Sequence, residues 1–470
     1  MSGGAPSLRA SSARIATLAW PVLVGQVAVL AFTTVDTAMV ARHSTADLAA
    51  LAVGAAAYIA VFIGLSGVVL AVGPLAGQLF GARRHSAAGA QLHQAVWLAL
   101  GLSVLGSAVL LFPAPFLALA RASPEVEVKV RGYLFALALS LPAALLFSAY
   151  RGFNNAVSRP KAVMALQLGG LALKLPLTAL LVFGAGPLPA LGVTGCGIAT
   201  CIVMWCQALI AWQVVRRDRF YAPFALTGRG LHAPDAIALR AQLKLGVPMG
   251  LSIMVEVTGF AFMAFFIARI SVDAVAGHQL AANLVSLLFM LPLAIGHATS
   301  ALVAQCIGAD QRQEARHLGW HGLQLAAYCA LALGSVVFVG REAIVRLYTG
   351  NEAIVAAALP LLAWVGVFHF VDAMQIVAAF VLRAWRVATL PVLVYVASIW
   401  GLGMGGGYVL AFDVGGWVPP ALHGARGYWI ASTLGLGVAA AGLSLLLVWV
   451  LRQQRRDAAS MSNSAGPRAG

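Results

Sequence analysis

Charged residues are scarce in this sequence. Asp, Glu, Lys and Arg make up only 10% of its 470 residues, whereas hydrophobic residues make up 61% and the mean hydropathy is +0.90. Soluble proteins carry about 25% charged residues, so this composition excludes an ordinary soluble globular protein. The chain is therefore predicted to be a polytopic membrane protein that resides in the lipid bilayer.

The sequence also lacks the motifs of common enzyme classes. It contains no HExxH, no GxSxG, no phosphate-binding P-loop and no paired CxxC. We therefore expect no catalytic residues, no enzymatic activity and no cofactor. Without a nucleotide-binding loop, an ion gradient is the expected energy source.

Cysteine is rare too, with five residues in the chain. Cys196, Cys201 and Cys206 follow one another at intervals of five, which turns each by about 140° around a helix. They cannot share a face and make a poor metal site. We expect all five cysteines to be small apolar fillers.

Long hydrophobic runs, in contrast, are abundant. Runs of about 20 to 28 residues suit helices that cross a hydrocarbon core of about 30 Å, and helices satisfy their own backbone groups in lipid. The predicted fold is all-α, with twelve spans. Their ranges are 15–41, 50–80, 91–113, 131–150, 162–184, 190–215, 243–269, 275–305, 318–339, 357–382, 388–411 and 427–451. The first run continues to Val40, too long for a signal peptide, so we expect this span to be retained.

The basic residues indicate the topology. Of the 30 Lys and Arg residues, 21 fall in alternate connections that include both termini and the central linker, eight fall in the opposite set, and Lys174 lies inside a span. Basic residues favour the cytoplasmic side, so both termini are predicted to be cytoplasmic. Because the net charge of +15 is spread over short loops rather than gathered in one patch, no nucleic-acid partner is expected.

The two halves of the chain resemble each other. At an offset of 227, Pro21 matches Pro248, Gln78 matches Gln305, and FGA at 80–82 matches IGA at 307–309. Such a repeat predicts two six-helix lobes related by a pseudo-twofold axis along the membrane normal. The predicted parts are an N-lobe at 1–215, a cytoplasmic linker at 216–242, a C-lobe at 243–451 and a disordered tail at 452–470.

Most charged residues of the predicted spans lie at span ends, but four lie deeper: Asp36, Lys174, Glu256 and Asp372. An ionisable side chain at mid-membrane depth costs about 2.5 to 3.5 kcal/mol on insertion, and it marks an ion path, a relay or a pair. Glu256 and Asp372 lie at similar depths near the centres of their spans. We expect them to meet across an interior cavity and to bind a proton or a metal cation. The alternative for each is a neutral, hydrogen-bonded structural acid.

The first half offers a different pair. Lys174 is central in its span, and Asp36 is the only acid inside a span of this half, so Asp36 is its predicted partner. The alternatives are an aspartate that reaches interfacial water and a lysine that snorkels. Thr178, Gln279 and Asn283 add neutral polar groups at depth, whereas histidines in these spans are expected to be satisfied core residues.

Several stretches together resemble the multidrug and toxic compound extrusion (MATE) family, in particular its NorM-like bacterial branch. These stretches are WPVLVGQVAVLAFTTVDTAMV, GPLAGQLFGARR, PMGLSIMVEVTGF, AGHQLAANLVSLLFMLPLAIG and VDAMQIVAAFVLRAW. They cover both halves and therefore nearly the whole chain.

The resemblance implies a monomer in the bacterial cytoplasmic (inner) membrane, whose lobes alternate between inward and outward openings. It implies export of cationic or amphipathic drugs in exchange for sodium or protons. Asp36 matches the acid of the family's first helix, Glu256 that of the seventh and Asp372 that of the tenth. The last two match a C-lobe cation site. The resemblance implies that both carboxylates bind the coupling cation, such as sodium, and that Asn283 is a neighbour.

The sequence departs from the family in the fifth span, where relatives carry asparagines and this chain has Lys174 and Thr178. A cation beside Asp36 competes with a proton or sodium there, which favours coupling through Glu256 and Asp372. A lipid-linked-sugar flippase of the same architecture is the alternative function. It would require several Lys or Arg residues in the cavity to bind pyrophosphate, and Lys174 is the one central cation in the predicted spans.

Overall fold

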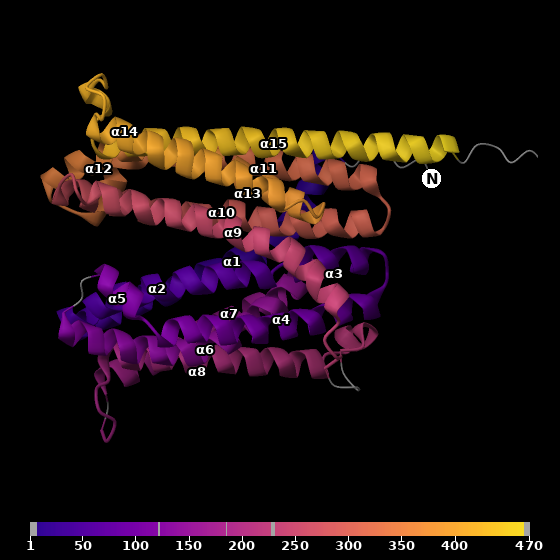
Figure 1. Ribbon diagram of the computed structural model, residues 1–470, viewed down its shortest axis with the longest axis horizontal. Helices are drawn as coiled ribbons and strands as arrows, with labels where there is room; N and C mark the ends of the chain where they lie inside the picture. The colour runs from indigo at the N-terminus through magenta and orange to yellow at the C-terminus, as the bar shows by residue number, and fades with distance from the viewer. Residues whose placement is uncertain (1–6, 121–122, 185, 227–230, 465–470) are drawn as a thin grey trace, which may run out of the picture. The chain divides into compact units, whose positions relative to one another are not determined.

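The computed structural model describes residues 7–120, 123–184, 186–226 and 231–464, and over 119–120 and 455–464 it describes the backbone alone. Every element of these ranges is helical (Figure 1). The first-half helices are α1 Leu8–His43, α2 Thr45–Val69, α3 Val72–Gly81, α4 His85–Leu111, α5 Ala114–Ala120, α6 Pro124–Ala156, α7 Pro160–Phe183 and α8 Gly192–Arg217. A 3-10 helix, η1 Arg219–Phe224, follows.

The second-half helices are α9 Ala236–Ile267, α10 Val272–Gly308, α11 Arg312–Tyr348, α12 Glu352–Ala384, α13 Thr389–Tyr395, α14 Gly406–Phe412 and α15 Ala425–Ser464. A π-helix, η2 Val396–Gly405, joins α13 to α14, and a 3-10 helix, η3 Pro420–Leu422, precedes α15. Helix α15 thus continues to Ser464, inside the segment predicted to be disordered, and residues 465–470 lie outside the described residues.

Twelve segments of the described chain are long and apolar enough to cross a membrane. Their number and order are those predicted, with α2 and α3 forming one span and α13, η2 and α14 forming another. Several helices extend beyond the predicted spans. Helix α6, for example, ends at Ala156 rather than at 150, which places Arg151 inside a helix instead of a loop.

The chain forms two compact units, and the boundary between them does not lie at the middle of the sequence. The first unit contains Ala13–Thr258 and Ala304–Gln311, and the second contains Met1–Ser12, Gly259–Val303 and Arg312–Gly470. The inner part of α9 and the end of α10 therefore pack with the first half. Glu256 belongs to the first unit, and Asp372 belongs to the second.

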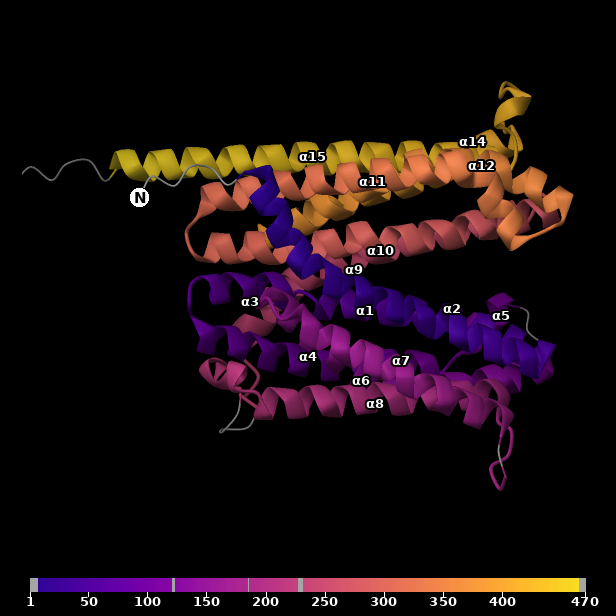
Figure 2. The same ribbon diagram turned by 180° about the vertical axis from the view of Figure 1, so that it is seen from behind.

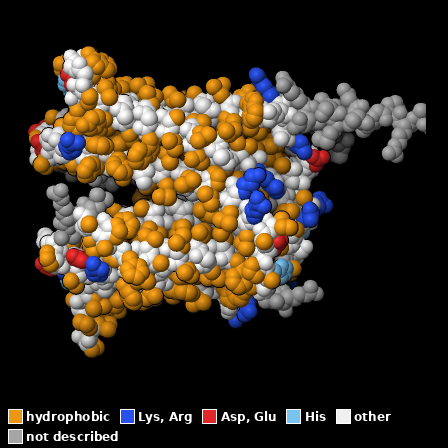
Figure 3. Space-filling model, in the orientation of Figure 1, with side chains coloured by type: hydrophobic (Ala, Val, Ile, Leu, Met, Phe, Trp, Pro, Cys, Tyr) orange, Lys and Arg blue, Asp and Glu red, His pale blue; other side chains and the backbone are white. Residues whose placement is uncertain are grey.

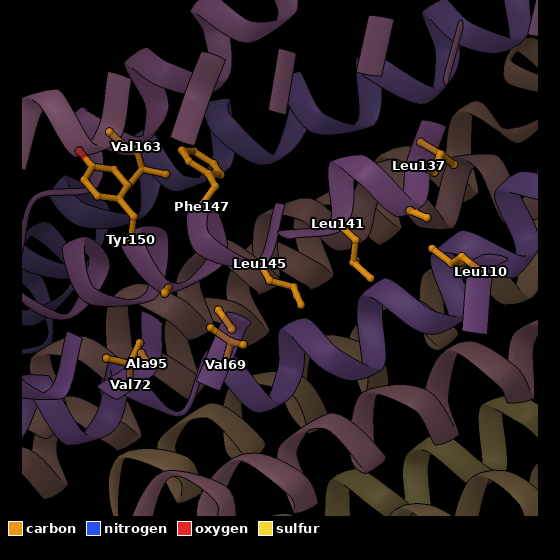
Figure 4. Packing of buried hydrophobic residues seen from close by; sticks show 14 of the residues in the cluster. Val69, Val72, Ala95, Leu110, Leu137, Leu141, Leu145, Phe147, Tyr150 and Val163 are labelled. Carbon is orange, nitrogen blue, oxygen red and sulfur yellow. The ribbon is translucent and has the colours of Figure 1, made fainter. Parts of the chain in front are cut away.

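Helix α6 is the centre of the first unit. It packs against α2, α4 and α8 (Figures 1 and 2), and 72% of its most apolar stretch is buried. Leu137, Leu141 and Leu145 extend from α6 into a core shared with Val69 of α2 and Leu110 of α4 (Figure 4). Burying such side chains contributes about 1.5 to 3 kcal/mol each when the reference is water, so α6 provides a rigid support for neighbouring polar groups.

Helix α12 has the corresponding place in the second unit, between α11 and α15. Helix α15 also packs against η2, a ten-residue π-helix rich in glycine, VASIWGLGMG. Gly435 of α15 lies against this segment so closely that an added Cβ would be 2.6 Å from the Ser398 carbonyl oxygen. π-Helical turns leave backbone groups in unusual positions and are frequent near functional sites.

Glycines allow α2 and α9 to cross closely within the first unit. A Cβ on Gly246 would lie 2.3 Å from the Val68 carbonyl oxygen, and one on Gly250 would lie 2.5 Å from that of Gly64. Gly246 and Gly250 are one helical turn apart, the small-xxx-small spacing that lets membrane helices approach each other. This contact fixes the inner part of α9 to α2.

A second close crossing joins α3 to the end of α10. A Cβ on Gly81 would lie 1.9 Å from the Gln305 carbonyl oxygen, and one on Gly308 would lie 1.8 Å from that of Gln78. Gly77 approaches Ala304 between these contacts. At the offset of 227, Gly308 is equivalent to Gly81 and Gln78 to Gln305, so the second contact repeats the first with the two helices exchanged. Gly77 meets its own equivalent, Ala304. We call these six residues, Gly77, Gln78, Gly81, Ala304, Gln305 and Gly308, the glycine crossing.

Charged side chains gather near the helix ends on the face shown in Figure 3, whereas hydrophobic side chains cover the flanks of the helices. This distribution is typical of helices surrounded by lipid, because an ionisable group costs least where it reaches the interface. The interior charges are therefore exceptions that need a specific explanation.

Candidate functional site

The structure brings together the predicted pair in the first half. Lys174 Nζ of α7 lies 2.9 Å from Asp36 Oδ1 of α1, and it donates a hydrogen bond of 2.6 Å to Thr200 Oγ1 of α8. The lysine is 0% exposed and the aspartate 9%. The ammonium also lies 5.5 Å from the centre of the Phe32 ring, which offers a cation–π contact. Lys174 is thus enclosed by three helices and does not snorkel.

Thr178 lies one turn after Lys174 on α7 and is fully buried, as predicted for a position at depth. Its hydroxyl has no hydrogen-bond partner in the described part of the chain. A buried hydroxyl without a partner costs free energy. This polar face of α7 therefore extends one turn beyond the Asp36–Lys174 pair.

Asp372 is buried within α12 and is held by a chain of hydrogen bonds. Gln375 Nε2, one turn further on, donates to Asp372 Oδ1 over 3.0 Å, and the Tyr395 hydroxyl of α13 donates to Gln375 Oε1. The three residues are 4%, 0% and 1% exposed. Tyr395 therefore fixes the amide, and the amide fixes one oxygen of the carboxylate.

Glu256, Gln279 and Asn283 are less enclosed. Glu256 on α9 is half-buried, whereas Gln279 and Asn283, one turn apart on α10, are exposed. By the helical rise, Glu256 lies about 16 Å from the outer end of its helix, and Asn283 lies equally far along its own. Lipid tails cannot bond exposed polar groups at this depth, so water access to this face of α10 is expected. Glu256 and Asp372 belong to different units, and their pairing stays a prediction.

The histidines near this site are buried but not satisfied. His278 on α10 packs against Phe260 and Trp429, with ring centroids 5.8 and 5.9 Å away. Its Nδ1 and both ring nitrogens of His369 lack hydrogen-bond partners among the described residues. The expectation of satisfied core histidines is therefore wrong for these two, because aromatic side chains rather than polar groups surround His278.

No group of three or more His, Cys, Asp or Glu side chains in the described ranges is arranged to hold a metal ion. This excludes a cysteine or histidine cluster from that part of the chain, where the five cysteines form no disulfide. A sodium ion carried as a coupling substrate differs from such a cluster, because hard cations also take neutral carbonyl and amide oxygens.

Two arginines that sequence reasoning assigned to loops lie inside helices. Arg151 belongs to α6, where its Nη1 is 3.4 Å from Gln26 Oε1 of α1, and Arg383 belongs to the last turn of α12, where it is 6% exposed. Arg151 lies in YRGF at 150–153 and Arg383 in LRAW at 382–385, two stretches that match at an offset of 232. This match is the only sequence signal that could have set the two arginines apart. A basic residue one position beyond a predicted span otherwise resembles a loop residue.

The linker between the halves is anchored to the first unit. Arg159 Nη1, at the start of α7, lies 2.5 Å from Asp218 Oδ2. The backbone N–H of Phe220, and then the Arg159 guanidinium, hold the pKa of Asp218 below its ordinary value. Further along, Trp97 Nε1 and Gln94 Nε2 of α4 donate to the carbonyl oxygens of His232 and Ala233.

Known proteins of similar sequence are bacterial multidrug resistance proteins. The chain is 40% identical to the "Probable multidrug resistance protein NorM" of Aromatoleum aromaticum, over 92% of each chain. It is 32% identical to the "Multidrug resistance protein PmpM" of Pseudomonas aeruginosa, over 97% of this chain and 96% of that one. It is 34% identical to the "Multidrug resistance protein NorM" of Vibrio cholerae, over 93% and 95%.

Solved structures show the same fold. The eukaryotic MATE transporter AtDTX14 matches with a TM-score of 0.84 over 96% of this chain and 99% of its own, and the Vibrio cholerae MATE transporter VcmN in its bent form matches with 0.82 over 95% and 98%. Both are 18% identical in sequence. The MatE family model matches twice, at residues 21–180 and 248–409, so the two matches begin at the repeat offset of 227. The chain belongs to the MatE family.

Proposed function

We propose that this chain is a secondary active transporter that exports cationic or amphipathic small molecules in exchange for sodium or protons. Three facts support the proposal: membership of the MatE family, the names of its multidrug-resistance relatives, and ionisable residues inside membrane helices. We further propose that it acts as a monomer in the bacterial inner membrane, with both termini in the cytoplasm.

The observation that carries the proposal is the buried carboxyl of Asp372. Its hydrogen-bond chain through Gln375 to Tyr395 aims one oxygen in a fixed direction. A fixed carboxylate in a medium of low dielectric has a strong preference for a cation or a proton. It therefore suits a group that must take up and release a coupling ion.

Glu256 supplies the second carboxylate of the proposed mechanism. In the state that is open to the outside, Glu256 and Asp372 each take up sodium or a proton, and this uptake displaces the cationic drug. Binding of either ligand weakens binding of the other by the same factor. Moving one elementary charge through 100 mV supplies about 2.3 kcal/mol, roughly a fifty-fold concentration ratio.

Neutral substitution of the two acids tests this mechanism. Glu256→Gln and Asp372→Asn remove the charge with little change of shape, so we expect each to reduce ion-driven ethidium export at least ten-fold. The measurement is efflux from proteoliposomes under a sodium gradient or a proton gradient imposed separately. Comparison of the two gradients identifies the coupling ion.

The matched control is Glu342→Gln, which removes an acid that is 67% exposed on α11 and pairs with Arg346. It should export ethidium at the wild-type rate. If both acid variants export ethidium normally while they are present in the membrane in normal amounts, the coupling role of these residues is refuted.

The lipid-linked-sugar flippase remains the second candidate, because Arg151 and Arg383 add two cations inside helices. The acids Glu256 and Asp372 would repel a pyrophosphate group, which favours the drug exporter. Proteoliposomes loaded with a fluorescent polyprenyl-pyrophosphate lipid separate the two functions. Scrambling of that lipid without ethidium export would support the flippase.

A further inference from the structure

Arg151 is a cation inside the first unit with no acid beside it among the residues that the structure describes. It lies five residues before the end of α6, about 8 Å along the helix by the 1.5 Å rise. In the described part of the chain, no carboxylate oxygen is within 4.0 Å of its nitrogens, and its contact is the neutral Oε1 of Gln26. A guanidinium stays charged in proteins, so this charge requires an acceptor from elsewhere.

Unpartnered polar atoms lie together at this place. Arg151 Nε is buried without a hydrogen-bond partner among the described residues, and so is Oδ1 of Asn155. The two residues are four positions apart and therefore share one face of α6. Gln26 approaches that face from α1. Both side chains of α6 remain partly exposed, although lipid tails could not bond them.

The inner end of this region is covered by protein. Gln305 Nε2, in the glycine crossing, donates to the Ala156 carbonyl oxygen over 2.7 Å and to Ser158 Oγ over 2.9 Å. The end of α10 therefore packs against the last turn of α6, beside the residue that follows Asn155.

Lys174 cannot serve as the anion-binding cation of this unit, since it is 0% exposed and already paired with Asp36. Arg151 differs in being partly exposed and in having free donors. Its planar guanidinium group can donate two parallel hydrogen bonds to the two oxygens of a carboxylate. The amide of Gln26, whose oxygen faces Arg151, can offer its N–H groups to the same anion.

We propose that Arg151, together with the N–H groups of Gln26, binds the carboxylate group of zwitterionic amphipathic substrates. The proposal rests on the proposed export function and specifies which substrates the first unit favours. Molecules that carry both a carboxylate and a cationic amine would be recognised at two places, the carboxylate here and the amine by acids elsewhere. Purely cationic molecules would lack the first contact.

The test compares norfloxacin with its methyl ester, which keeps the amine and the ring system but has no carboxylate. Binding of each compound to the purified full-length protein is measured through its own fluorescence. We expect the wild type to bind norfloxacin about ten-fold more tightly than the ester, and Arg151→Gln to abolish that ratio. Arg151→Lys keeps the positive charge but cannot donate two parallel hydrogen bonds. We therefore expect a ratio between those of the wild type and Arg151→Gln.

The matched control is Arg131→Gln, on the same helix, where the side chain is 49% exposed and pairs with Glu127. It should keep the wild-type ratio. An unchanged ratio in both Arg151 variants would overturn the proposal, and so would a wild type that binds the two compounds equally, as a site for small inorganic anions would. If Arg151→Gln does not fold, the Arg151→Lys ratio decides.

A separate outcome concerns the proposed function. Wild-type protein that binds norfloxacin in preference to the ester but exports neither norfloxacin nor ethidium would refute the export function and leave the carboxylate site in place. Wild-type protein that exports ethidium while showing no preference for norfloxacin over the ester would refute only the carboxylate site. The two failures are therefore distinguishable.

Discussion

The Asp36–Lys174 pair is the most enclosed ionic contact in the described part of the first unit. Lys174 is 0% and Asp36 9% exposed as whole residues, and Thr200 and Phe32 contact the ammonium. Two buried opposite charges are neutral as a pair, but each alone is costly in a low dielectric. We therefore expect the pair to act as a neutral structural lock between α1 and α7, which leaves Glu256 and Asp372 as the candidates for coupling.

Removal of one partner tests this lock. Lys174→Met leaves Asp36 as a buried carboxyl without a cation and should lower the free energy of unfolding by about 3 to 5 kcal/mol. The double variant Lys174→Met with Asp36→Leu removes both charges and should recover most of the loss. The measurement is the melting temperature of all four proteins of the cycle. Additive losses would contradict the pairing role.

At the scale of helices, the glycine crossing joins α3 to the end of α10 with no room for a side chain. The atoms that an added Cβ would meet are backbone carbonyl oxygens, at 1.8 and 1.9 Å. A backbone carbonyl group cannot relieve the overlap by changing rotamer, as a flexible side chain can, so the two helices would have to separate. Gln305, whose amide also holds the end of α6, would move with them.

We therefore expect Gly81→Ala and Gly308→Ala each to destabilise the protein by about 1 to 3 kcal/mol, the usual cost of overpacking. Both should also reduce export. Gly101→Ala on α4 is the matched control, because a Cβ there meets nothing within 4 Å, and alanine favours a helix by up to about 1 kcal/mol over glycine. Equal melting temperatures for Gly81→Ala and Gly101→Ala would show that the crossing tolerates a side chain.

At the scale of the whole molecule, charge and helix number together predict the orientation. Twelve spans place both ends of the chain on one side, and the basic residues are concentrated in the connections on that side. Alkaline phosphatase fused after Gly470 should therefore be inactive, and green fluorescent protein there should fluoresce. A phosphatase fused within the α1–α2 connection, after His43, should be active. The reverse pattern would contradict the predicted orientation.

Much of this fold was predictable, because a long apolar run can form little other than a helix that crosses the membrane. The Asp36–Lys174 contact was predictable for a similar reason, since the first half has one acid inside a span. Arg151 was not, because a basic residue at the edge of an apolar run does not reveal how many turns its helix continues. The packing of the inner part of α9 with the first unit was not predictable either. It depends on close contacts of Gly246 and Gly250 with α2, and the spacing of the two glycines in the sequence does not show which helix they meet.

The glycine crossing has a consequence for how such a chain could arise. Gly81 meets Gln305 while Gly308 meets Gln78, and Gly77 meets Ala304, so the contact maps onto itself when the two repeats are exchanged. That is the geometry of an isologous interface between identical subunits. Two copies of a half-length ancestor could have formed it as a homodimer before their genes fused. After fusion, each glycine became a separate target for mutation, and neither can gain a side chain without displacing the other repeat.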